Sequence, residues 1–127
     1  MFEIDQKVIE KPEKLTPAVL QVAEMLGMYH AELARVLKLQ CADIGRLASV
    51  QQFIEQGTVA WEQAVLFIRF YQALYKMHSG NEIAIYNWMR VENKQLKGTP
   101  LLLIVDNNCL EYVLSFIENT LNVTNGK

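Results

Sequence analysis

The sequence predicts an all-α fold, a small bundle of about seven helices. Apolar residues recur at the spacing of a helix face in one segment after another, residues typical of helix starts precede several segments, and glycine follows others. No segment alternates apolar and polar residues well enough to form a sheet. With 127 residues the chain has the size of one ordinary domain, and its apolar surplus is available for an interface.

The N-terminal part is predicted to be an arm followed by a helix. Residues 1–15 are rich in charged side chains, and Pro12 interrupts any helix there, so we expect a flexible arm. Thr16 followed by Pro17 is typical of a helix start, because the first turn of a helix has no use for the N–H that proline lacks. The apolar residues that follow fall on one stripe, which predicts a helix over residues 17–26.

The next segment has the pattern of a helix-turn-helix. A first helix is predicted between His30 and Leu39, and the second, the recognition helix, contains an apolar periodic stretch from Asp43 to Ile54. The positions that fit the motif are the inward residues of both helices, a small residue at their crossing and an apolar residue in the turn: Leu33, Ala34, Leu37, Leu39, Ile44 and Leu47. Lys38 occupies the turn position where glycine is common, at an expected cost of ~1 kcal/mol.

Four further helices are predicted from similar signals. Thr58 can cap a long helix whose apolar residues cover much of its circumference. The apolar run Leu101–Val105 could equally be a buried strand, but because no second strand is available to pair with it, we expect a helix. Asn108 with Glu111 makes a capping box for the last helix. The predicted ranges are 59–78, 81–96, 101–105 and 108–121.

The recognition helix supplies the candidate DNA-binding residues. The outward positions that would face the major groove are Gln40, Ala42, Asp43, Gly45, Arg46 and Ser49. Arg46 and Gln40 are the strong base readers among them, whereas Asp43 would repel the DNA backbone unless it met a cytosine amino group. Arg35 and Lys38 would contact phosphates. The formal net charge of −2 argues against strong non-specific binding, and the same apolar spacing also fits a purely architectural hairpin.

The second half of the chain carries a more particular pattern. It contains Trp88-Met89-Arg90, then Asn93, then Leu96-Lys97-Gly98-Thr99-Pro100-Leu101 and Leu103. Together with the preceding motif, this segment resembles the Xre/MbcA/ParS family of bacterial antitoxins, over about residues 17–121. The resemblance implies an Xre-like helix-turn-helix domain over residues 16–78 and a toxin-binding helical domain over residues 79–127. The residues that it assigns to toxin binding are Trp88, Arg90, Asn93, Gly98, Pro100, Leu101 and Leu103.

The resemblance also implies partners. Members of the family typically pair as dimers, bind a RES-class toxin that degrades or modifies NAD, and repress their own operon, so a RES-type toxin, operator DNA and a second copy are expected. The chain departs from the family at Cys109, where glycine is usual, and at Asn119-Thr120, where an arginine-isoleucine pair is common. A stand-alone regulator or interaction module without a toxin is the alternative.

The residue pattern also predicts the shape of this segment. Gly98 is expected to end one helix in a left-handed conformation, making a sharp corner that presents Trp88.

Other residue patterns argue against an enzyme. No carboxylate pair, Ser-His or Cys-His arrangement or phosphate loop occurs at a spacing that catalysis needs. Cys41 and Cys109 lie far apart, and His30 and His78 are not spaced as metal ligands around them, so we expect no metal, no cofactor and reduced thiols. Charged residues interrupt the longest apolar segment, and the N-terminus lacks the pattern of an export signal. A cytoplasmic protein without membrane contact is therefore expected.

Overall fold

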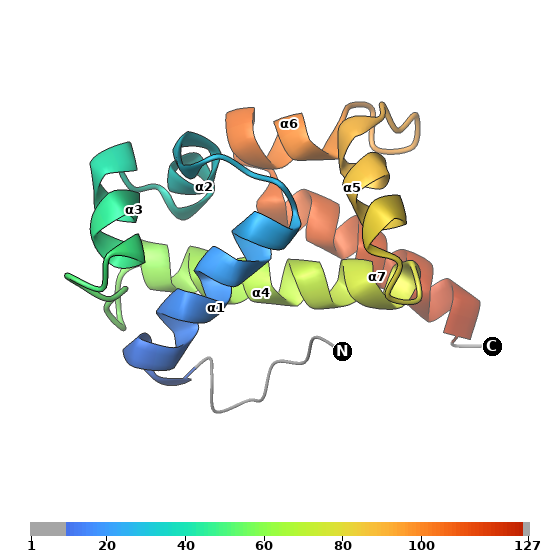
Figure 1. Cartoon of the computed structure of the whole chain (residues 1–127). Helices are drawn as coiled ribbons and strands as arrows, with labels where there is room; N and C mark the ends of the chain where they lie inside the picture. Colours follow the sequence, from blue (N-terminus) through green and yellow to red (C-terminus); the bar gives the residue numbers. More distant parts are fainter. Residues whose placement is uncertain (1–9, 126–127) are drawn as a thin grey trace.

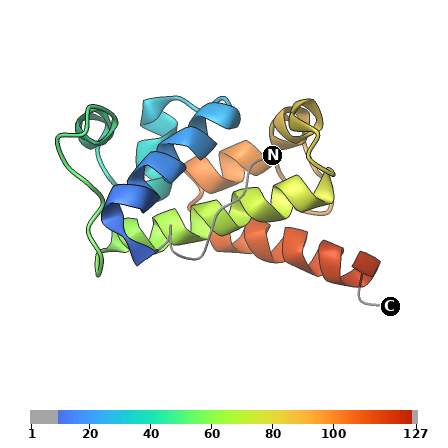
Figure 2. The same cartoon turned by 60° about the horizontal axis from the view of Figure 1, so that its bottom comes forward.

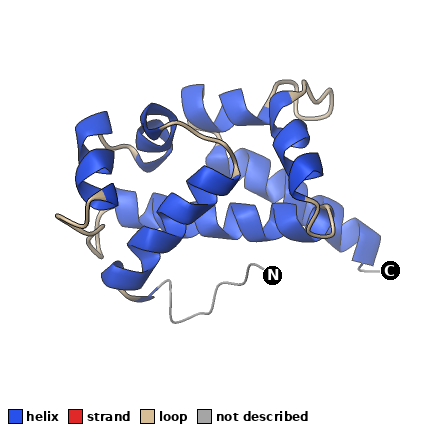
Figure 3. Cartoon of the chain, viewed as in Figure 1, coloured by secondary structure: helices blue, strands red, loops and turns tan. Residues whose placement is uncertain are grey.

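The computed structural model describes residues 10–125, and these form seven helices and no strand. The prediction of an all-α fold is confirmed over this part of the chain, as Figures 1 and 3 show. The helices are α1 (Pro12–Met25), α2 (His30–Leu37), α3 (Cys41–Ala48), α4 (Val59–Met77), α5 (Glu82–Arg90), α6 (Pro100–Asp106) and α7 (Leu110–Asn125). None of these helices is long and apolar enough to cross a lipid bilayer.

Helix α4 is the centre of the bundle. Helices α1 and α2 pack against it towards one end, and α7 runs along another side (Figures 1 and 2). As expected for a helix with apolar residues around much of its circumference, α4 buries side chains along its whole length, with Phe67 and Tyr71 among the largest. One continuous core runs from Leu15 in α1 to Ile117 in α7, across the predicted domain boundary after residue 78. The two predicted domains therefore share a core.

The start of α1 corrects the predicted arm. The helix begins at Pro12 rather than at residue 17, and Pro12 lies in the first turn, where its missing N–H leaves no helix bond unmade. Pro17, expected at a helix start, lies inside α1. The arm prediction is therefore wrong for residues 12–15, while residues 1–9 lie outside the described part of the chain.

Tertiary contacts explain why α1 extends through Pro17. Leu15 is completely buried and Thr16 is only 1% exposed. The Thr16 Oγ1 accepts a hydrogen bond from the backbone N–H of Ile54 at 2.9 Å. The hydroxyl expected to cap a helix thus holds the loop between α3 and α4. Burial and this bond compensate for the backbone hydrogen bond that Pro17 cannot donate.

Helix α3 ends at Ala48, although the apolar spacing predicts a helix as far as Ile54. The Ser49 hydroxyl donates to the carbonyl of Gly45 at 2.9 Å in the last turn, and Val50 adopts a left-handed φ of 63°. A β-branched residue in that conformation ends the helix. The apolar residues beyond it belong to a loop, in which Ile54 is 4% exposed. Apolar spacing alone therefore could not locate this helix end.

Helix α5 ends at Arg90, not at residue 96 as predicted. The following residues form a tight turn, in which the Asn93 Oδ1 accepts two backbone N–H groups at 2.9 and 3.1 Å. This side chain offers the backbone an alternative to the helix. Lys97, rather than Gly98, adopts a left-handed φ of 63°, so the expected role of Gly98 as a left-handed helix end is wrong.

The starts of the later helices were predicted with mixed success. The Thr58 cap of α4 is confirmed, since its Oγ1 accepts from the Trp61 N–H at 3.1 Å. The preference for a helix over a strand after Thr99 is also confirmed, because α6 is helical. The capping box expected at Asn108 is wrong: Asn108 has a left-handed φ of 56°, and α7 begins at Leu110.

Candidate functional site

The α2–α3 hairpin contains the positions of the predicted helix-turn-helix. Leu39 is half-buried, and the other inward positions are no more than 3% exposed: Leu33, Ala34, Leu37, Ile44 and Leu47. Lys38 takes the left-handed conformation expected in the turn, with φ 61° and ψ 42°. The N–H of Leu39 then bonds to the carbonyl of Ala34 at 2.8 Å. The hairpin is therefore held by its inner face, and Figure 1 places α3 at the edge of the bundle.

The outward face of α3 is made mostly of small side chains. Ala42, Gly45, Arg46 and Ser49 are exposed, and Gln40 precedes the helix with an exposed side chain. A Cβ at Gly45 would meet no atom within 4 Å, so nothing stands over the middle of the helix. Arg46 is consequently the longest side chain on this face.

Asp43 lies at the edge of the same face and holds Arg46. Its Oδ2 accepts the backbone N–H of Gln40 at 3.0 Å, and its Oδ1 accepts the Arg46 Nη2 at 2.5 Å. These hydrogen bonds, first from the Gln40 backbone and then from the Arg46 guanidinium, hold the pKa of the Asp43 carboxyl below its ordinary value. The carboxylate is therefore ionised at neutral pH, and the α3 face has one cation and one anion in contact.

The remaining predicted DNA contacts differ in availability. The Ser49 hydroxyl is occupied by the carbonyls of Gly45 and Arg46, at 2.9 and 3.3 Å. Arg35 forms an ion pair with Asp106 of α6, and both side chains are largely exposed. Lys38 is exposed at the hairpin turn. The structure therefore leaves few cations close to α3.

The residues assigned to toxin binding lie around the α5–α6 corner, but several hold the fold. Arg90 donates to the carbonyls of Leu26 and Gly27 at 2.9 and 3.1 Å, and its guanidinium lies 3.7 Å from the centre of the Tyr86 ring. These contacts satisfy the carbonyls of the two residues that follow α1. Trp88 is half-buried, and its ring packs edge to face with the ring of His78, with the ring centroids 6.0 Å apart. Both side chains therefore join α5 to its neighbours.

The turn between α5 and α6 uses the other assigned residues. Asn93 and Gly98 pair in an isolated bridge, with backbone hydrogen bonds of 2.9 and 3.2 Å. A Cβ at Gly98 would lie 3.2 Å from the Leu103 side chain, so this close approach favours glycine. Pro100 and Leu101 are buried. These residues determine the path of the backbone at the corner and do not form its outer surface.

The exposed apolar side chains near this corner were not identified from the sequence. Val91 is 62% exposed, Leu102 51% and Tyr112 49%. The Tyr112 hydroxyl donates to the carbonyl of Leu96 at 3.1 Å, which ties α7 to the turn. Leu102 lies between Leu101 and Leu103, which the resemblance assigns to toxin binding. The apolar run is too short for its periodicity to predict that Leu102, rather than its two neighbours, is the exposed residue.

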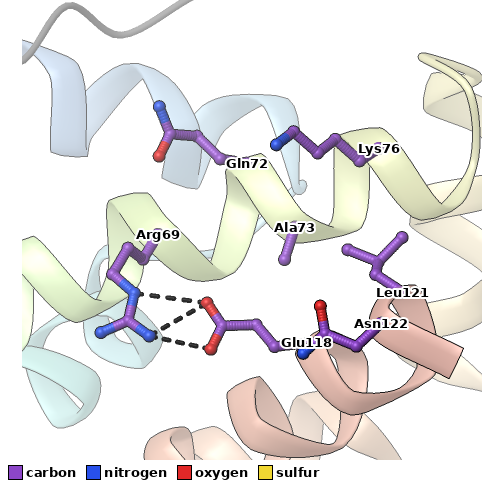
Figure 4. A pocket seen from close by; sticks show the side chains of 7 residues that line it. All are labelled: Arg69, Gln72, Ala73, Lys76, Glu118, Leu121 and Asn122. Atoms are coloured by element: carbon purple, nitrogen blue, oxygen red, sulfur yellow. Dashed lines mark hydrogen bonds and ion pairs between the residues drawn. The ribbon is translucent and has the colours of Figure 1, made fainter. Parts of the chain in front are cut away.

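Two grooves lie on the described part of the chain, one away from the predicted sites and one beside the hairpin turn, where the predicted phosphate contact Lys38 is part of the lining. One, of about 340 Å³, lies between α4 and α7, where Arg69 donates to both carboxylate oxygens of Glu118 at 2.8 to 3.3 Å (Figure 4). Figure 4 shows the guanidinium turned towards Glu118, so its charge is already neutralised. The other, of about 350 Å³, lies beside the hairpin turn and includes Lys38, Phe53 and Glu55 in its lining. Neither groove has the composition of a catalytic site.

Metal ligands and family relationships add no further site. Residues 10–123 contain no group of three His, Cys, Asp or Glu side chains that could hold a metal ion. Cys41 is exposed and Cys109 is half-buried, and both are free thiols. No protein-family model and no curated protein sequence matches the chain.

Proposed function

We propose that the protein is the antitoxin of a toxin–antitoxin pair, which binds operator DNA through α3 and a RES-type toxin through the α5–α6 corner. The observation that carries the proposal is the layout of the molecule. The α3 face and the turn after α5 lie towards opposite ends of one continuous core, so one body can bind two partners at once (Figures 1 and 2). The family resemblance of the corner motif supports the choice of partners.

In this proposal, helix α3 is the DNA-binding element. Its inner face is packed and its outer face carries small residues around Arg46, which suits a helix that enters the major groove. Because Lys38 and Arg35 are the nearby cations of the hairpin and Arg35 is already paired, one copy would bind DNA weakly. A homodimer on a two-part operator would compensate by linking two weak contacts.

In this proposal, the corner between α5 and α6 is the toxin-binding surface. Trp88, Arg90 and Gly98 fix its shape from within, and Val91 and Leu102 are the apolar side chains that it presents to a partner. In this role the protein acts by covering the toxin rather than by catalysis. Such a pair works in the cytoplasm, where both NAD and the operon are found.

The toxin-binding half is tested by co-expression with a RES-type toxin encoded beside the gene. We expect the two proteins to purify together and the cells to keep their NAD, whereas Leu102→Asp should abolish both effects without changing the helical circular dichroism spectrum. Val123→Asp is the matched control, because Val123 is also an exposed apolar residue, at 77%, but lies near the end of α7. Capture of the toxin by Leu102→Asp at the wild-type level would refute the corner as its binding surface.

One observation favours a second function, an interaction module that binds no DNA. Arg46 is the one cation of α3, and it is held by Asp43. If the protein is such a module, the wild type should bind duplex DNA at low salt no more strongly than the Arg46→Ala variant does. Gel-shift titration of the DNA upstream of its own gene separates the two functions.

A further inference from the structure

We propose that Asp43 and Arg46 act as one unit that reads a C·G base pair in the major groove. The inference rests on the DNA-binding half of the proposed function and specifies what that half recognises. It follows from the contact between the two side chains, from what a C·G pair presents, and from what surrounds the contact on α3.

The contact fixes both side chains. The Asp43 carboxylate accepts the Gln40 N–H at 3.0 Å and the Arg46 Nη2 at 2.5 Å. Arg46 is therefore held at the surface of α3 with 48% of its side chain exposed, while Asp43 is 24% exposed. A guanidinium has further N–H donors, and each carboxylate oxygen can accept a second hydrogen bond. The pair can thus bind a ligand without breaking its own contact.

A C·G pair presents groups that complement this arrangement. Across the major groove, guanine offers two adjacent acceptors, N7 and O6, and cytosine offers the N4 amino donor beside them. Arg46 would donate to both guanine acceptors, and Asp43 would accept from the cytosine amino group. In an A·T pair the donor and an acceptor exchange places, so the adenine amino group would face Arg46 and the thymine O4 would face Asp43. Both contacts would then be unfavourable.

The neighbouring residues of α3 leave the contact between Asp43 and Arg46 as the part of this face that can recognise a base pair. Ala42 and Gly45 add no long side chain to the outward face, and the space over Gly45 is open. The Ser49 hydroxyl bonds back to its own helix. Because the contact is electrically neutral, it adds little attraction to phosphates, and its contribution is selectivity among base pairs rather than general affinity.

The experiment selects DNA from a randomised duplex library with the full-length protein. We expect the wild type to enrich a C·G pair at one position of each half-site. Arg46→Lys keeps the charge but loses the planar fork, so the preference for C·G should fall by about 10-fold to 100-fold. Asp43→Asn should lower the preference by a similar factor while binding unselected duplex at least as tightly as the wild type, because a repulsive carboxylate is removed.

Glu32→Gln is the matched control. Glu32 occupies the same position in α2 as Asp43 does in α3 and accepts the Tyr29 N–H at 2.9 Å, but it has no place on the α3 face. It should leave the selected sequence unchanged, which separates base reading from helix capping. Arg46→Lys retains the exposed cation and keeps the test valid if Asp43→Asn unfolds.

Four results would overturn the inference. An unchanged C·G preference in Arg46→Lys removes Arg46 from the reading, and an unchanged preference in folded Asp43→Asn removes Asp43. Enrichment of sequences without a C·G pair refutes the inference but leaves the DNA-binding half of the proposed function standing. Failure of the wild type to enrich any duplex refutes both, and co-purification with the toxin then decides the remaining half.

Discussion

Replacing Thr16 with valine tests the contact that ties the loop after α3 to α1. Thr16 is 1% exposed, and its Oγ1 accepts the buried N–H of Ile54 at 2.9 Å. Valine has nearly the same shape, so Thr16→Val opens no cavity but leaves the Ile54 N–H without a partner. An unsatisfied buried donor costs about 1–3 kcal/mol, and we expect the free energy of unfolding to fall by about 1.5 kcal/mol.

Urea denaturation followed by circular dichroism measures this loss. With a slope of about 1.5 kcal/mol per molar urea, the midpoint should fall by about 1 M. Thr120→Val is the matched control. The Thr120 hydroxyl donates to the Phe116 carbonyl at 2.9 Å, and that carbonyl lies inside α7. Removing the hydroxyl should therefore change the free energy of unfolding by less than about 0.5 kcal/mol. Equal midpoints for Thr16→Val and the wild type would refute the proposed role of the hydroxyl.

Three further predictions concern the charged contacts. Arg90→Lys should lower the free energy of unfolding by about 1–2 kcal/mol, because the single nitrogen of lysine cannot replace both Nη2, which donates to the carbonyls of Leu26 and Gly27, and Nη1, which donates to the carbonyl of Tyr86; unchanged thermal stability would mean that Arg90 serves a partner instead. The Arg35–Asp106 pair should show a coupling below about 1 kcal/mol in a double-mutant cycle at low salt, since both side chains are exposed; a larger coupling would contradict this estimate. Because the pKa of Asp43 is lowered in the folded state, its stabilisation is fully present above about pH 4 and is lost as the pH falls through the folded-state pKa. Asp43→Asn should therefore reduce stability at pH 7 but progressively less at lower pH, and an equal reduction at pH 2 would contradict the sign.

Most of the helices could be predicted from the sequence, because the apolar residues of a helix face recur at a regular spacing. The spacing of Leu33, Leu37, Ile44 and Leu47 identified residues that are buried in the hairpin, and the left-handed turn at Lys38 followed from its position. Helix ends were less predictable. Local propensities differ by fractions of a kcal/mol, so a single buried contact can lengthen a helix and a turn-forming side chain can shorten one.

The sequence names candidate site residues, but it does not reveal most of the contacts that these residues make in the structure. Asp43 and Arg46 are three residues apart on a helix, a spacing from which an ion pair could have been anticipated. The contact between Arg90 and Leu26 joins residues 64 positions apart, and no local pattern reports it. Sequence likeness therefore suggested Arg90 as a partner-binding residue, whereas the structure gives that side chain an internal role.

The sequence by itself determined that the chain is helical and which helix faces turn inward, because apolar periodicity is a property of neighbouring residues. Only the tertiary structure decided where α1 begins, which of the polar side chains are already engaged, and that a single core spans both halves. The physical reason is that these outcomes depend on burial and hydrogen bonds between residues distant in sequence, which together outweigh local preference.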